Sequence, residues 1–116
     1  MKDRTIIQER YLRDSVPVRL GGLAANLLRI NSFASQETNS TVVESLLDES
    51  KFFIEWTARE VEIEKAAELV ELQIQLTRWQ YNWLTIWNDS VQRRRVAEQS
   101  HVWSDRVLDM SGLLDG

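Results

Sequence analysis

The 116-residue sequence has no cysteine, one histidine, one proline and four glycines. Without thiols, the chain cannot form disulfides, use a cysteine nucleophile, or bind zinc or iron–sulfur clusters through thiolates. A single histidine leaves little material for an imidazole metal site, so we expect no metal and no other cofactor. Scarce proline and glycine disfavour a many-stranded fold, which needs turn residues at each reversal. No apolar run approaches the roughly 18 residues of a membrane span.

The formal net charge is −4, and it is unevenly distributed. Residues 1–35 carry a net +3, whereas residues 36–71 carry a net −7. We expect the basic first third to pack beside the acidic middle third. A chain with this acidic balance lacks the general basic face that nucleic acid or an anionic membrane requires. Residues 1–5 are charged and lead into no signal-peptide core. The prediction is a cytoplasmic protein with no nucleic-acid or membrane partner.

Apolar residues recur at helical spacing along nearly the whole chain. We predict an all-α fold, in which residues 1–116 form a single helical-bundle domain of four to five helices. The expected helices cover residues 4–13, 17–34, 42–56, 58–99 and 101–110. The long helix over 58–99 would be the spine of the bundle, and Asn88-Asp89-Ser90 is the place where it would break.

Two apolar rows follow the predicted long helix. The first row steps by three and four residues, like the a and d positions of a coiled coil, and consists of Leu69, Leu72, Leu76, Trp79, Trp83 and Ile86. We call these residues the seam. The second row consists of Ile63, Ala67, Val70, Ile74, Tyr81 and Leu84. A helix that is apolar on two sides is expected to be packed on two sides. The seam is therefore a candidate for the core or for a subunit interface.

The length of this helix and its tryptophans favour association with a second copy. Unbroken over 58–99, the helix would be roughly 63 Å long, whereas a compact domain of this size is about 35 Å across. Either the helix breaks near residues 88–90, or a second subunit covers its projecting part. Trp79, Trp83 and Trp87 share one helical face, and tryptophan is common both in interfaces and in cores. We predict a homo-oligomer, most simply a dimer, with Trp87 joining the seam as a candidate contact.

One short segment supports a chemical alternative. Glu98-Gln99-Ser100-His101 is a Glu-x-x-His motif, and two such motifs with further glutamates hold the metals of di-iron bundles. A dimer would supply two copies. The segment from Arg95 to His101 also resembles the Arg–His motif of the HEPN family of dimeric helical ribonucleases, although Val96 stands where that family usually has a polar residue. The alternative hypotheses are therefore a HEPN-like ribonuclease or a metal-binding bundle centred on Arg95, Glu98 and His101.

Three segments resemble short all-helical proteins of cyanobacteria that have no known activity. They are SVPVRLGGLAANL at 15–27, FIEWT at 53–57 and VWSDR at 102–106. The resemblance implies a small cytoplasmic helical protein and assigns no functional residue. No catalytic constellation emerges from the sequence. The main prediction is a non-enzymatic, self-associating helical module that presents a protein-interaction surface.

Overall fold

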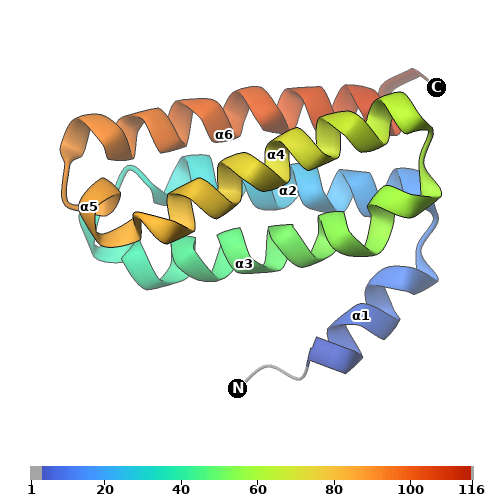
Figure 1. Ribbon diagram of the computed structural model, residues 1–116, viewed down its shortest axis with the longest axis horizontal. Helices are drawn as coiled ribbons and strands as arrows, with labels where there is room; N and C mark the ends of the chain where they lie inside the picture. The colour runs from blue at the N-terminus through green and yellow to red at the C-terminus, as the bar shows by residue number, and fades with distance from the viewer. Residues whose placement is uncertain (1–3, 116) are drawn as a thin grey trace.

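The computed structural model describes residues 4–115, and helices occupy almost all of that range (Figure 1). The α-helices are α1 (Arg4–Arg13), α2 (Val16–Phe33), α3 (Ser40–Thr57), α4 (Ile63–Tyr81), α5 (Trp83–Trp87) and α6 (Ser90–Ser111). Short 3₁₀ turns are η1 (Glu37–Asn39), η2 (Ala58–Glu60) and η3 (Leu113–Asp115). No residue between 4 and 115 lies in a strand. The all-α prediction is confirmed.

Helices α2, α3, α4 and α6 form a bundle in which each long helix runs opposite to the one before it (Figure 1). α2 has its most extensive contacts with α6 and then with α3, whereas α4 packs mainly on α3 and crosses the front of the bundle. The short α5 turns the chain at one end of the bundle, and α1 projects at the other and contacts α3. This arrangement leaves one long side of α4 facing outwards.

Small side chains let α2 and α6 approach each other closely. Ser104 Oγ of α6 donates to the carbonyl of Ala24 at 2.8 Å, and Asn31 Nδ2 of α2 donates to the carbonyl of Ala97 at 2.8 Å. Ser100, which also lies on α6, is completely buried. These polar residues explain why α6 has a weak apolar pattern although it is central to the bundle.

The prediction of one helix over residues 58–99 is wrong, because this segment forms η2, α4, α5 and the first part of α6. Val61 and Glu62 are extended, and Asn82 is non-helical with φ −106° and ψ 23°. A break near 88–90 is present, where Asp89 Oδ1 accepts the backbone N–H groups of Val91 and Gln92 and caps α6. The predicted start of a separate helix at residue 101 is wrong too, since α6 runs unbroken from Ser90 to Ser111.

These breaks remove the overhang that the sequence suggested. The longest helix, α6, has 22 residues. It is therefore about 33 Å long at 1.5 Å per residue. The molecule is 38 Å along its longest axis, so α6 fits within it. Helix length no longer argues for a second subunit.

The expectation that the basic first third packs beside the acidic middle third is confirmed. Arg4 Nη2 lies 3.1 Å from Asp48 Oδ2, which links α1 to α3. Arg19 Nη1 lies 2.6 Å from Glu60 Oε2, which links α2 to η2. Both ion pairs join residues more than 40 positions apart in the sequence. They hold the α1–α2 region against the acidic middle of the chain.

Candidate interaction surface

The six seam residues and Trp87 all lie in the core of the single chain. The least buried of them is Ile86, which is 8% exposed, and Leu69, Leu72 and Leu76 are completely buried. The two indole N–H groups at the end of the seam also find partners inside the chain. Trp83 Nε1 donates to Ser40 Oγ at 3.2 Å, and Trp87 Nε1 donates to the carbonyl of Glu37 at 2.7 Å. The seam residues, Trp79, Trp83 and Trp87 included, therefore fill the bundle and do not form its surface.

The second apolar row is exposed. The exposed fractions of its larger members are Ile63 80%, Val70 51%, Ile74 48%, Tyr81 88% and Leu84 74%. Ala67 is exposed as well. The expectation that this helix is packed on both sides is therefore not met within one chain. Single exposed apolar residues are ordinary, but an aligned row of them along one helix is the kind of surface that marks an interaction site.

Thr77 lies in the middle of this row and completes its spacing. We call the six residues on α4 the outer row: Ile63, Ala67, Val70, Ile74, Thr77 and Tyr81. Leu84 lies beyond the break at Asn82, on α5. Val70, Ile74 and Thr77 line a shallow hollow of about 280 Å³ together with Gln73 and Arg78. The Thr77 hydroxyl donates to the carbonyl of Gln73 at 2.8 Å, so its polar group already has a partner. The centre of the outer row is a recess that an apolar side chain can enter.

Polar side chains border the outer row on both sides. Towards α6, Arg106 Nη2 lies 3.1 Å from Glu68 Oε1 and 3.7 Å from Glu71 Oε2. Towards α3, Lys51 Nζ donates to Gln80 Oε1 at 2.8 Å. An apolar strip with a polar rim is the general organisation of a protein–protein interface.

The structure does not join the three residues of the chemical alternative into a site. Arg95, Glu98 and His101 lie on successive turns of α6, and all three are exposed. The acidic partner of His101 is Asp105, whose Oδ2 is 3.6 Å from Nδ1. Among residues 4–115, no group of three or more histidine, aspartate or glutamate side chains is placed to hold a metal ion.

A second hollow, of about 230 Å³, lies between α1 and α3. Its walls include Phe52, Trp56 and Asp48, and the chain's own Arg4 contributes to it. The Arg4 guanidinium lies 4.0 Å from the centre of the Phe52 ring and bonds to Asp48. The sequence analysis missed this aromatic and acidic recess, although the spacing of Phe52 and Trp56 is that of residues on one helical face. Because Arg4 already occupies it, this recess is a weaker candidate than the outer row.

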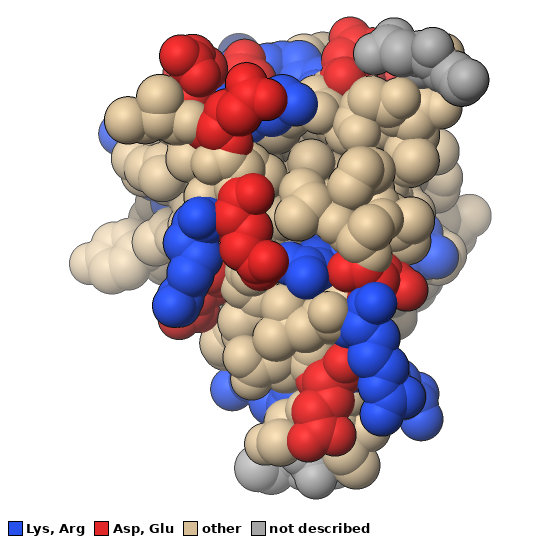
Figure 2. Space-filling model, turned by 90° about the vertical axis from the view of Figure 1, so that its right-hand side faces the viewer, with Lys and Arg blue, Asp and Glu red and all other residues tan. Residues whose placement is uncertain are grey.

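Figure 2 shows the end of the bundle on the right of Figure 1, where acidic and basic side chains are interspersed. On this face they form no continuous patch of one sign. Within the described residues, no helix is long and apolar enough to cross a membrane.

No family model, curated protein or solved structure matches this chain. The resemblance to helical proteins of cyanobacteria stays a prediction. Any functional conclusion therefore depends on the geometry of the chain itself.

Proposed function

We propose that this protein is a non-enzymatic helical module that self-associates, and presents an interaction surface to protein, through the outer row of α4. The observation that carries the proposal is the exposure of Val70, Ile74 and Tyr81 on one face of a well-formed helix. Burying apolar surface contributes about 25 cal/mol per Å², so an aligned apolar face gains free energy when another helix covers it. Helices that dock on such faces do so through residues spaced by three and four.

The size of the outer row supports a weak and reversible complex. α4 has 19 residues and is therefore about 29 Å long. A complex of ordinary size buries about 800 Å² on each partner, which is about a ninth of the 7151 Å² accessible surface. One face of α4 supplies only part of that area. We expect dissociation constants on the order of micromolar or weaker.

Sedimentation over a wide range of protein concentration tests this function. Wild type is expected to shift from monomer to dimer between about 1 µM and about 500 µM, a range that spans weak association. Ile74→Glu should remove the shift, because it places a charge in the middle of the apolar row. The matched control is Leu28→Glu on α2, since Leu28 is 46% exposed and Ile74 is 48% exposed. A wild type that stays monomeric, or an Ile74→Glu variant that still associates, would contradict the proposal.

The other functional hypotheses gain no support from the geometry. A ribonuclease or metal site centred on Arg95, Glu98 and His101 stays a prediction from the sequence. The cytoplasmic location and the lack of nucleic-acid partners stay predictions as well.

A further inference from the structure

We infer that the outer row of α4 binds α4 of a second copy running antiparallel, with Glu71 of each copy facing Arg78 of the other. The inference rests on the proposed function and specifies its partner, direction and register. It assigns a role to two charged residues that the sequence analysis did not single out.

The spacing of the outer row fits a paired helix. From Ile63 to Tyr81, all on α4, the steps are four, three, four, three and four residues. A strict alternation of four and three is the repeat that keeps one helix aligned along another in a coiled coil. Within a single chain, the seam already uses the opposite side of α4 for the core. The outer row is thus a second pairing face, and nothing within residues 4–115 covers it.

The sizes of these side chains favour the antiparallel direction. An antiparallel pair centred between residues 75 and 76 brings Val70 against Tyr81 of the second copy, and Ile74 against its Thr77. Each layer then combines a larger side chain with a smaller one, which fills the space evenly. In particular, Ile74 of one copy meets the recess beside Thr77 of the other.

A parallel pair would fill the same space poorly. It would place each outer-row residue beside its own equivalent, so that Tyr81 meets Tyr81 and Ala67 meets Ala67. The Tyr81 layer would then be crowded and the Ala67 layer would leave a void, and both outcomes destabilise a packed interface.

The charges along the flank select the same register independently. In the antiparallel pair, Glu71 lies on one flank of the apolar row, directly after Val70. Arg78 of the second copy, which directly follows Thr77, lies on the same flank and faces Glu71. A two-fold axis forms this ion pair twice. A parallel pair would instead place Glu71 beside Ala66 and Arg78 beside Gln73, and it would form no ion pair. The apolar layers and the charges therefore agree on one arrangement.

Both side chains are available for this contact. Arg78 is exposed at the edge of the recess, and no hydrogen bond or ion pair of its guanidinium occurs within the part of the chain that the structure describes. The Glu71 side chain is 67% exposed, and its ion pair with Arg106 is long at 3.7 Å. A carboxylate can accept from two guanidinium groups, so Glu71 can contact Arg106 and the second copy's Arg78 together.

Disulfide trapping tests the direction and the register, and the absence of native cysteine makes the result unambiguous. Val70→Cys and Tyr81→Cys are mixed at a concentration where wild type associates and are equilibrated in a glutathione buffer. The antiparallel pair predicts a disulfide between the two different variants. It predicts none within either variant alone, because like positions would lie roughly 17 Å apart along the axis, far beyond disulfide reach. Leu28→Cys measures the background from random collision.

Charge reversal tests the Glu71–Arg78 contact. Arg78→Glu is expected to raise the dissociation constant about tenfold, because two weak ion pairs are lost and two repulsions appear. Glu71→Arg should weaken association similarly, and the double variant Glu71→Arg, Arg78→Glu should restore most of it. Circular dichroism checks that each variant is folded, which matters most for Glu71→Arg because Glu71 also lies near Arg106.

The outcomes separate this inference from the proposed function. If Ile74→Glu abolishes association but each cysteine variant cross-links with itself, the pair is parallel and the inference is wrong, whereas the function stands. The same holds if association requires Ile74 but no cross-link exceeds background, because another surface then faces α4. If association survives Ile74→Glu, the inference and the proposed function are both wrong.

Discussion

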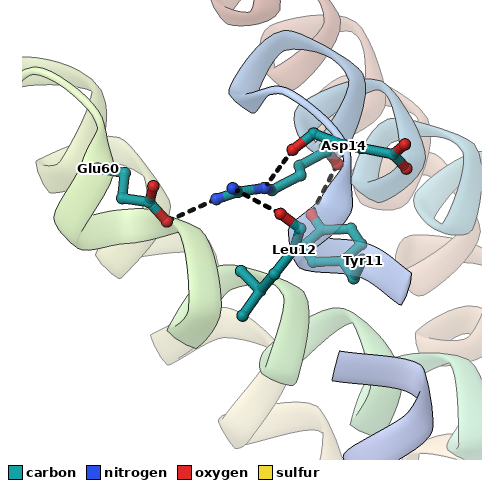
Figure 3. A network of polar contacts seen from close by, with 5 residues as sticks. Tyr11, Leu12, Asp14 and Glu60 are labelled. Carbon is teal, nitrogen blue, oxygen red and sulfur yellow. Dashed lines mark hydrogen bonds and ion pairs between the residues drawn. The ribbon is translucent and has the colours of Figure 1, made fainter. Parts of the chain in front are cut away.

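Arg19 Nη1 donates to Glu60 Oε2 at 2.6 Å and joins the first turns of α2 to η2, which precedes α4 (Figure 3). The Arg19 side chain is 8% exposed, whereas the Glu60 side chain is 45% exposed. Arg19 also donates to the backbone carbonyls of Asp14 and Leu12 at 2.9 and 3.3 Å. Its charge is therefore stabilised by three acceptors, two of which are backbone carbonyls in the last turn of α1 and in the connection to α2.

Replacing Arg19 should destabilise the fold more than replacing Glu60. Arg19→Met removes all three charge-assisted hydrogen bonds, and we expect it to lower the free energy of unfolding by about 2–3 kcal/mol. Glu60→Gln leaves the two carbonyl contacts in place, and its half-exposed carboxylate is screened by water, so we expect a loss of about 1 kcal/mol or less. Urea unfolding measures both values. Arg13→Met is the control, since Arg13 is exposed. Equal losses for Arg19→Met and Glu60→Gln would contradict this assignment.

Alkaline pH should destabilise the protein through Tyr11. Burial raises the pKa of Tyr11 to about 12. The phenol is protonated in both states below pH 10, but between about pH 10 and 12 the unfolded chain loses this proton while the folded chain keeps it. The free energy of unfolding should therefore fall by about 1.4 kcal/mol per pH unit over that window.

The variant Tyr11→Phe isolates this effect. It removes the hydrogen bond from the Tyr11 hydroxyl to the carbonyl of Arg19, at 2.7 Å, and should cost about 1 kcal/mol near neutral pH. It should also remove the part of the alkaline decline that Tyr11 causes. Urea midpoints of both proteins between about pH 8 and pH 12 provide the comparison. Parallel curves for wild type and Tyr11→Phe would show that Tyr11 is not responsible.

Two glycines should respond to alanine in opposite directions. Gly22 lies inside α2, and a Cβ there would lie 3.7 Å from Tyr11 Cε1, an ordinary contact. Gly22→Ala should therefore stabilise the protein by about 0.5–1 kcal/mol through helix propensity. Gly112 ends α6 with φ 74°, which alanine adopts only under strain. Gly112→Ala should destabilise by about 1 kcal/mol. Thermal unfolding measures both, and two changes of the same sign would be inconsistent with this account.

The sequence allowed the helices and the seam to be predicted, because Leu69, Leu72 and Leu76 repeat at helical spacing and are buried. It did not reveal where the long helix breaks. Neither Val61-Glu62 nor Asn82 involves proline or glycine, and buried residues keep their spacing across Asn82, from Trp79 to Trp83. Periodicity reports which residues face the core, but it is unchanged when the chain turns between two helices that share that core.

The same limit applies to the candidate site. The sequence showed that the long helix has a second apolar row, but the row alone does not show whether the chain or a partner covers it. Only the placement of α3 and α6 shows that Val70, Ile74 and Tyr81 stay exposed. Trp79, Trp83 and Trp87, which favoured an interface in the sequence, are buried in the core. The exposed apolar face consists of other residues.

Trp83 and Tyr81 lie two residues apart and should separate stability from association. Trp83 is 4% exposed, its ring centre is 5.1 Å from that of Trp87, and its indole N–H bonds to Ser40. We expect Trp83→Ala to lower the free energy of unfolding by about 3–5 kcal/mol, as truncation of a large buried aromatic residue does. The folded fraction should still associate as wild type does. Trp83→Phe keeps most of the packing and should cost less, which provides a reference if Trp83→Ala unfolds.

Replacing Tyr81 should instead weaken association and leave stability almost unchanged. It is 88% exposed, so Tyr81→Ala should change the free energy of unfolding by less than about 0.5 kcal/mol. In the antiparallel pair, however, Tyr81 covers Val70 of the second copy, and its removal should raise the dissociation constant about tenfold, since truncation of an aromatic contact in an interface commonly costs more than 1 kcal/mol. Urea unfolding and sedimentation of the same two variants measure the two effects. If Trp83→Ala impairs association at matched folded concentration while Tyr81→Ala does not, the subunit contact lies at the seam side of the bundle and the outer row is an ordinary exposed surface.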